Sequence, residues 1–233
     1  MHRGCFAGSF SDARRHLAPG STSPLLLSVF RRKVAWVFLK ASGWRIVGAA
    51  PDPSDTCIFV CAPHTSGFDS ALLLAVAWQN DLRLKFLIKS EIVEGPFGFF
   101  WRAVGAIPVE RDNPGPLVDQ LIELAKGDRG FQLALTPEGT RKPVEYWKSG
   151  FYRLARASGV QVQLCAPDGP TKVVTMGPMF HLSGDVSADM DRLRAFFEDK
   201  AGVDPSKATR AQMRAESDPV AAEELANIEP RSA

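Results

Sequence analysis

The sequence predicts an α/β domain with a largely parallel sheet flanked by helices. From Thr56 onward, short apolar segments alternate with longer segments that have helical periodicity. This alternation is typical of parallel strands joined by crossover helices. At 233 residues, of which 45% are hydrophobic, the chain is long enough for one such domain to bury a substantial core.

The elements follow in order along the chain. The predicted strands are short apolar runs at residues 57–62, 84–88, 106–109, 132–135, 160–165 and 172–176. The predicted helices lie between or after them, at residues 69–79, 97–104, 116–126, 147–157 and 188–200. Pro116 begins one of these helices and Gly159 ends another, which are the positions where each residue is favoured. The predicted domain spans residues 43–200.

The two ends of the chain differ from this domain in composition. Residues 1–22 are rich in Gly, Ser and Arg, which predicts a flexible leader. A proline in the first turn begins a predicted helix over residues 23–42. The last segment, residues 201–233, is polar, Ala-rich and acidic, which predicts a disordered tail.

The helix over residues 23–42 has two open interpretations. Its basic residues, Arg31, Arg32, Lys33 and Lys40, stand among large apolar ones. At 100° per residue these basic side chains do not gather on one face. A helix lying on an anionic membrane surface and a helix packed on the domain are therefore equally compatible with the sequence.

Net charge, hydropathy and cysteine spacing exclude several classes of protein. A formal net charge of +2 is too small to indicate a nucleic-acid partner. No apolar run approaches the ~20 residues of a transmembrane helix, so membrane contact is expected to be peripheral. The four cysteines form neither a CxxC pair nor a Cys/His cluster, which indicates no disulfide framework and no metal site. We expect a cytoplasmic protein, peripherally associated with the inner face of the membrane.

The segment Ala62 to Ser70 carries the main chemical signal. His64 and Asp69 are five positions apart, and five residues turn a helix by ~500°, so the two cannot share one helix face. They can meet if His64 lies in a turn and Asp69 in the first turn of the following helix. Asp69 then holds one imidazole nitrogen and leaves the other free as a base. The alternative is a Ser66-x-x-Asp69 capping box that serves only the helix start.

Two arginines lie just after predicted strands. Arg111 follows the strand 106–109, and Arg141 follows the strand 132–135. If the sheet is parallel, both arginines lie at the edge that carries His64. A guanidinium group suits a phosphate, although a solvated surface charge is the simpler interpretation of each arginine alone.

Residues 137–141 read Pro-Glu-Gly-Thr-Arg. Glu138, Gly139 and Thr140 can form a tight turn whose backbone N–H groups point into the site.

In this order, the motifs His64-x4-Asp69, Gly105 to Arg111 and Pro137 to Arg141 resemble the first three motifs of the bacterial glycerolipid acyltransferase family, which includes the 1-acylglycerol-3-phosphate O-acyltransferases. The similarity extends to Lys89-Ser90-Glu91 and to Trp147-Lys148-Ser149-Gly150-Phe151, and it covers about residues 43–200. Pro63, Pro108 and a fourth motif without its proline, at residues 160–165, depart from the family pattern. Because the His64–Asp69 pair is intact, these departures affect the identity of the acceptor and the shape of the acyl pocket, and not the type of reaction.

The resemblance implies a single α/β acyltransferase domain, with His64 as base and Asp69 as its partner. It also implies acceptor-binding residues, namely Lys89, Arg111, Glu138, Gly139, Thr140 and Arg141. The implied acyl donor is a thioester, acyl-CoA or acyl carrier protein, the implied acceptor is a lysophospholipid, and no cofactor is implied.

Direct transfer from the thioester is the favoured hypothesis, because a thioester is already activated and the chain has no GxSxG nucleophile elbow. Three alternatives stay open. The first is acyl transfer to another lyso-lipid, such as a lyso-aminolipid. The second is a thioesterase in which the same pair activates water, and the third is a non-catalytic lipid-binding protein.

Overall fold

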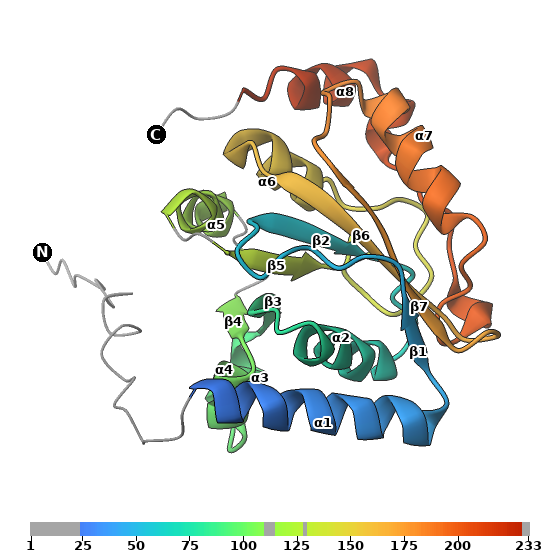
Figure 1. The fold of residues 1–233 in the computed structure, drawn as a ribbon. Coiled ribbons are helices and arrows are strands. Elements are labelled where there is room, and N and C mark those ends of the chain that lie inside the picture. Colours follow the sequence, from blue (N-terminus) through green and yellow to red (C-terminus); the bar gives the residue numbers. More distant parts are fainter. Residues whose placement is uncertain (1–23, 110–114, 128–129, 230–233) are drawn as a thin grey trace, which may run out of the picture.

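A sheet lies at the centre of the structure, between two layers of helices (Figure 1). The structure is a computed structural model that describes residues 24–109, 115–127 and 130–229. Within these residues the sheet has seven strands in the order β1-β7-β6-β2-β5-β3-β4. The strands are β1 (Arg45–Val47), β2 (Cys57–Cys61), β3 (Leu84–Lys89), β4 (Ala106–Val109), β5 (Gln132–Leu135), β6 (Gln161–Asp168) and β7 (Val173–Phe180).

Neighbouring strands are parallel, except that β6 and β7 are antiparallel. The prediction of a largely parallel sheet is therefore confirmed. The sequence did not predict β1, because its three residues alternate between exposed and half-buried and form no apolar run. β1 lies at one edge of the sheet, where Arg45 is opposite Val173 of β7.

β2 is buried along its whole length, because it lies inside the sheet and helices cover both faces. Its alternate side chains enter two different cores. Ile58 and Val60 pack into one hydrophobic cluster, whereas Phe59 and Cys61 pack into the other. The end of β2, from which the segment with His64 begins, is thus fixed from both sides.

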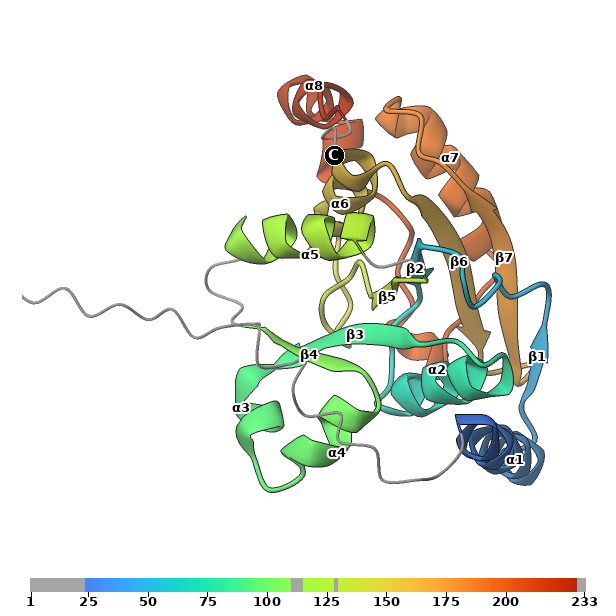
Figure 2. The same cartoon turned by 60° about the vertical axis from the view of Figure 1, so that its left-hand side comes forward.

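The helices divide between the two faces of the sheet (Figures 1 and 2). One face carries α1 (Pro24–Ser42), α2 (Phe68–Gln79), α3 (Ser90–Glu94) and α4 (Gly98–Ala103). The other carries α5 (Gly115–Gly127), α6 (Gly150–Ser158), α7 (Val186–Phe197) and α8 (Pro219–Ala226). α6 begins three residues later than predicted, because Trp147 instead forms a bridge with Met213.

α1 packs on α2 along one side only. Ala35 and Leu39 are buried there. The opposite side exposes large apolar side chains: Leu25, Leu26, Leu27, Val29, Phe30, Val34, Trp36 and Val37. One side of this helix therefore packs on the domain, and the other side is exposed to solvent. No helix within the described ranges is long and apolar enough to cross a membrane.

The prediction of a disordered tail is wrong for residues 201–229. This segment contains two 3₁₀ turns (Pro205–Lys207 and Arg214–Glu216) and α8. Met213 and Leu225 are almost fully buried in the larger core, although the residues around them in the sequence are mostly small or charged. The polar composition of the segment therefore predicted disorder, whereas these two buried side chains attach it to the core. Residues 1–22, the predicted leader, lie outside the described residues.

Candidate active site

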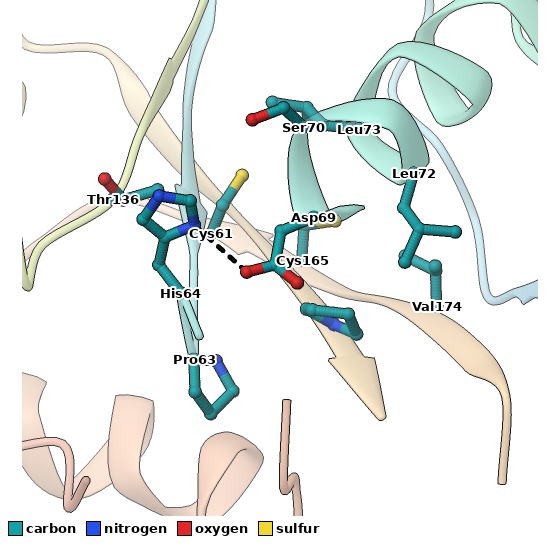
Figure 3. Close-up of a pocket in the computed structure, with 11 residues that line it drawn as sticks. Cys61, Pro63, His64, Asp69, Ser70, Leu72, Leu73, Thr136, Cys165 and Val174 are labelled. Atoms are coloured by element: carbon teal, nitrogen blue, oxygen red, sulfur yellow. Dashed lines mark hydrogen bonds and ion pairs between the residues drawn. The ribbon is translucent and has the colours of Figure 1, made fainter. Parts of the chain in front are cut away.

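The segment between β2 and α2 lies at the carboxyl ends of the parallel strands. His64 comes three residues after the end of β2, and Asp69 is in the first turn of α2. The two residues therefore have the positions that their spacing predicts. The ring nitrogen Nδ1 of His64 lies 3.1 Å from Oδ2 of Asp69. The dashed line in Figure 3 marks this contact.

The Asp69 carboxylate also organises the backbone of the turn. The same Oδ2 accepts the backbone N–H groups of Thr65, at 2.7 Å, and Ser66, at 2.9 Å. The Ser66 hydroxyl accepts the N–H of Phe68, but the helix cap is Gly67, which has no side chain to cap with. Asp69 thus serves the turn and the histidine at once, which is more than a capping box requires.

This contact has a definite chemical consequence. The side chains of His64 and Asp69 are 19% and 9% exposed, so their interaction is shielded from solvent while the ring stays accessible. An ionised Asp69 accepts a hydrogen bond from the Nδ1–H group of His64, which leaves Nε2 without a proton and able to act as a base. The same carboxylate stabilises the imidazolium that forms when Nε2 takes a proton.

A small cavity of about 50 Å³ adjoins this pair. Its walls are mostly apolar and come from β2, α2, β6 and β7, with the lining residues Cys61, Pro63, His64, Asp69, Ser70, Leu72, Leu73, Thr136, Cys165, Pro167 and Val174 (Figure 3). The volume suits a few water-sized groups and not a long chain. A larger apolar ligand therefore needs side chains to move or must lie across the mouth of the cavity.

The Cys61 thiol in this cavity is not poised as a nucleophile. Cys61 and Cys165 are opposite each other on β2 and β6, and both are buried. A hydrogen bond to Cys165, together with burial, raises the pKa of the Cys61 thiol well above its usual value. A neutral thiol is a poor nucleophile, which leaves the ring of His64 as the candidate reactive group beside this cavity.

The turn at residues 137–141 faces the His64 segment, because β5 is next to β2 in the sheet. Gly139 has a positive φ of 66°, which suits glycine. Its N–H donates to the carbonyl of Thr136 at 3.0 Å, so this N–H does not point into the site as predicted. Thr140 accepts the N–H of Lys142 within the same turn. Glu138 is buried and accepts the N–H of His64 at 3.1 Å.

Two cations from different segments lie beside these turns. A Cβ atom added at Gly67 would lie 3.2 Å from Nη1 of Arg141, so this guanidinium is adjacent to the start of α2. A Cβ added at Gly139 would lie about 3 Å from the end of the Lys148 side chain. Both cations are exposed, and neither forms an ion pair within the described residues. Their charge is therefore available to an anionic ligand.

Lys148 lies beside the candidate site, and sequence reasoning assigned it no role. Its signal was the Trp147-Lys148-Ser149-Gly150-Phe151 segment, which matched the family pattern without indicating where the side chain goes. Lys89 ends β3 at the same edge of the sheet and is exposed. Arg111 lies outside the described residues, although β4, which precedes it, ends at this edge too. No cluster of His, Cys, Asp and Glu in the described part of the chain has the form of a metal site.

Comparison with known proteins shows the family of this chain. Residues 45–167, more than half of the chain, match the model of a protein family described as Acyltransferase. The chain belongs to the acyltransferase family. The acyltransferase is also similar to a solved structure, the 1-acyl-sn-glycerophosphate (LPA) acyltransferase PlsC from Thermotoga maritima, with a TM-score of 0.52 and 17% identity.

That similarity covers 89% of this chain and 86% of the Thermotoga chain, and it shows that the two proteins share a fold. Among curated proteins, no sequence matches this acyltransferase significantly. The family and the fold together make the protein an acyltransferase.

Proposed function

We propose that this acyltransferase moves a fatty acyl group from a thioester, acyl-CoA or acyl carrier protein, to the free hydroxyl of a lysophospholipid. The favoured acceptor is 1-acylglycerol-3-phosphate, with phosphatidate as product. The observation that carries the proposal is the contact of His64 Nδ1 with Asp69, which leaves Nε2 free. The adjoining turns carry Arg141 and Lys148, which form no ion pair among the described residues.

The reaction is a direct transfer. Nε2 of His64 removes the proton of the acceptor hydroxyl as that oxygen attacks the thioester carbonyl carbon. Collapse of the tetrahedral intermediate breaks the C–S bond, and the imidazolium of His64 returns its proton to the departing thiolate. Asp69 stays ionised throughout and stabilises the imidazolium between the two steps. The new C–O ester bond replaces the C–S bond, and the net proton balance is zero.

The charge around the pair supports a phosphate-bearing acceptor. Arg141 lies beside Gly67 in the turn that follows His64, Lys148 packs on Gly139 in the neighbouring turn, and Lys89 lies at the same sheet edge. Charge-assisted bonds to phosphate are stronger than neutral ones, and a guanidinium can bind two oxygens at once. The acceptor in the name of the Thermotoga protein, an acylglycerophosphate, has this chemistry.

Exposed apolar side chains support a membrane-surface location. α1 and the α3–α4 pair lie at the same end of the molecule in both Figures 1 and 2. Phe97 and Phe99, in α4 or just before it, are 68% and 75% exposed. α1 carries Arg31, Arg32, Lys33 and Lys40 and no acidic residue, which suits an anionic leaflet. We propose peripheral association with the cytoplasmic face of the membrane through this end.

The proposed activity is tested by supplying purified protein with acyl-CoA or acyl carrier protein and a panel of lysolipids. Thiol release and the lipid product are followed together. Acceptor-dependent thiol release that matches phosphatidate formation supports the proposal. A preference for lyso-aminolipids would replace the acceptor, and thiol release with free fatty acid would show a thioesterase.

A further inference from the structure

Glu138 is a buried carboxylic acid that contacts the backbone of the candidate base. The residue is 4% exposed, and its Oε1 accepts the N–H of His64 at 3.1 Å. The two residues are 74 positions apart and meet because β2 and β5 are neighbours, with Val60 opposite Leu135. Glu138 therefore joins two loops that leave the sheet side by side.

The environment of this carboxyl group disfavours its ionised form, which a residue with only a structural role would have no reason to tolerate. Oε2 is buried and has no hydrogen-bond partner within the described residues. No lysine or arginine in this part of the chain forms an ion pair with it. Burial raises the pKa of Glu138 from its usual value near 4.5 to about 7. A buried acid kept at such a cost is typical of functional sites.

The position of Glu138 does not suit a contact with substrate. It does not line the cavity beside His64 and Asp69. The exposed cations near Glu138 are Arg141, three residues later in the same turn, and Lys148, which packs on Gly139. Glu138 points inward, to the backbone behind the histidine.

We propose that Glu138 is a positioning residue for His64, in which its carboxyl oxygen fixes the backbone of the base while Asp69 fixes the ring. This inference rests on the proposed function, and for Glu138 it replaces the substrate-binding role that the family resemblance implies. Held at its N–H and at Nδ1, the residue keeps Nε2 in one place relative to the cavity. Displacement of a reacting group by about 1 Å can reduce a rate by about a hundredfold.

Two variants of nearly equal size separate the hydrogen bond from the packing. Glu138→Gln keeps an oxygen that can accept the His64 N–H, whereas Glu138→Met fills the same space without an acceptor. We expect Glu138→Met to lower kcat by about tenfold to a hundredfold, with KM for donor and acceptor within about twofold of wild type. We expect Glu138→Gln to retain most of kcat.

Amide hydrogen exchange at His64 gives a readout that needs no substrate. The His64 amide should be protected in the wild type and in Glu138→Gln, and should exchange at least about tenfold faster in Glu138→Met. If the wild-type protein transferred no acyl group to any lysolipid, the proposed function would fail, yet the exchange rates would still decide whether Glu138 holds His64.

Either of two results would overturn the inference. One is a His64 amide that exchanges at the same rate in the wild type and in Glu138→Met. The other is a Glu138→Met enzyme whose kcat is kept while KM for the lysolipid rises, which would make Glu138 a substrate contact.

Discussion

His64 and Asp69 act as one unit in the proposed mechanism, because Asp69 binds both the ring and the turn that carries it. We expect His64→Ala to lower acyl transfer by ~10²–10⁴ or more, since a general base is lost. Asp69→Asn should be nearly as damaging, because an amide can present its N–H to Nδ1 and stabilise the wrong tautomer. The measurement is acceptor-dependent thiol release, with circular dichroism as the control for folding. A folded His64→Ala protein with near-normal transfer would show that another group is the base.

The cations at the site should affect binding of the acceptor more than turnover. Removal of Arg141 or Lys148 deletes a charge-assisted bond worth about 1.5–3 kcal/mol, or about tenfold to a hundredfold in KM. We expect this loss for lysophosphatidate with Arg141→Ala and Lys148→Ala, and also with Arg111→Ala. The matched control is Arg83→Ala, which removes an exposed cation just before β3, at the opposite edge of the sheet. Equal losses on a phosphate-free acceptor would exclude phosphate binding by these side chains.

The Glu138 carboxyl group should make stability depend on pH. Its pKa is near 4.5 ordinarily and about 7 in the folded protein, so the folded state holds the proton more tightly. Stability is therefore lost as pH rises from about 4.5 to about 7, by roughly 3 kcal/mol in all. Glu138→Gln lacks this titration. The melting temperature of Glu138→Gln should rise relative to that of the wild type between pH 5 and pH 8. A difference in melting temperature that does not change with pH would contradict a raised pKa for the buried acid.

Sequence reasoning located His64 and Asp69 because local geometry decides that contact. Five positions separate them, and one turn followed by one helical turn brings them together. The contact of Glu138 with His64 could not be found in this way, since it depends on the register of β2 with β5 across 74 positions. No local pattern contains that register.

At the scale of elements, the sequence left the location of α1 open because its basic side chains do not gather on one face. The structure resolves this by burying Ala35 and Leu39 against α2 while a broad apolar side stays exposed. Deletion of the whole helix would therefore remove core residues and destabilise the domain. Substitutions on the exposed side are the better test of membrane recruitment.

Vesicle binding should depend on the exposed side chains of α1 and of the α3–α4 pair. We expect Leu26→Ser with Phe30→Ser, and separately Phe97→Ser with Phe99→Ser, to reduce co-sedimentation with anionic vesicles, because shallow apolar insertion is lost. The melting temperature should change little, since all four side chains are exposed. Activity on a monomeric short-chain lysolipid should be kept. Unchanged vesicle binding in both double variants would reject this surface.

The whole molecule includes the segment that its composition suggested was a tail. A chain ending at Lys200 loses Met213 and Leu225, whose burial contributes about 1.5–3 kcal/mol each. We expect that truncated protein to be insoluble or to melt at a much lower temperature. A chain ending at Glu229 is the control and should match the full-length protein in melting and activity. Equal stability of both truncations would mean that residues 201–229 add nothing to the fold.

One contact in that segment has a consequence for how the protein is made. The N–H of Asp204 donates to the hydroxyl of Thr65, the residue after His64, across 139 positions of sequence. The edge strand β1 likewise cannot pair until β7 has been synthesised. During synthesis the turn that carries His64 leaves the ribosome long before the residues that support it. A nascent chain therefore carries His64 and Asp69 before these supporting contacts can form, and under the proposed mechanism we expect no acyl transfer until residues up to Asp204 have emerged and folded.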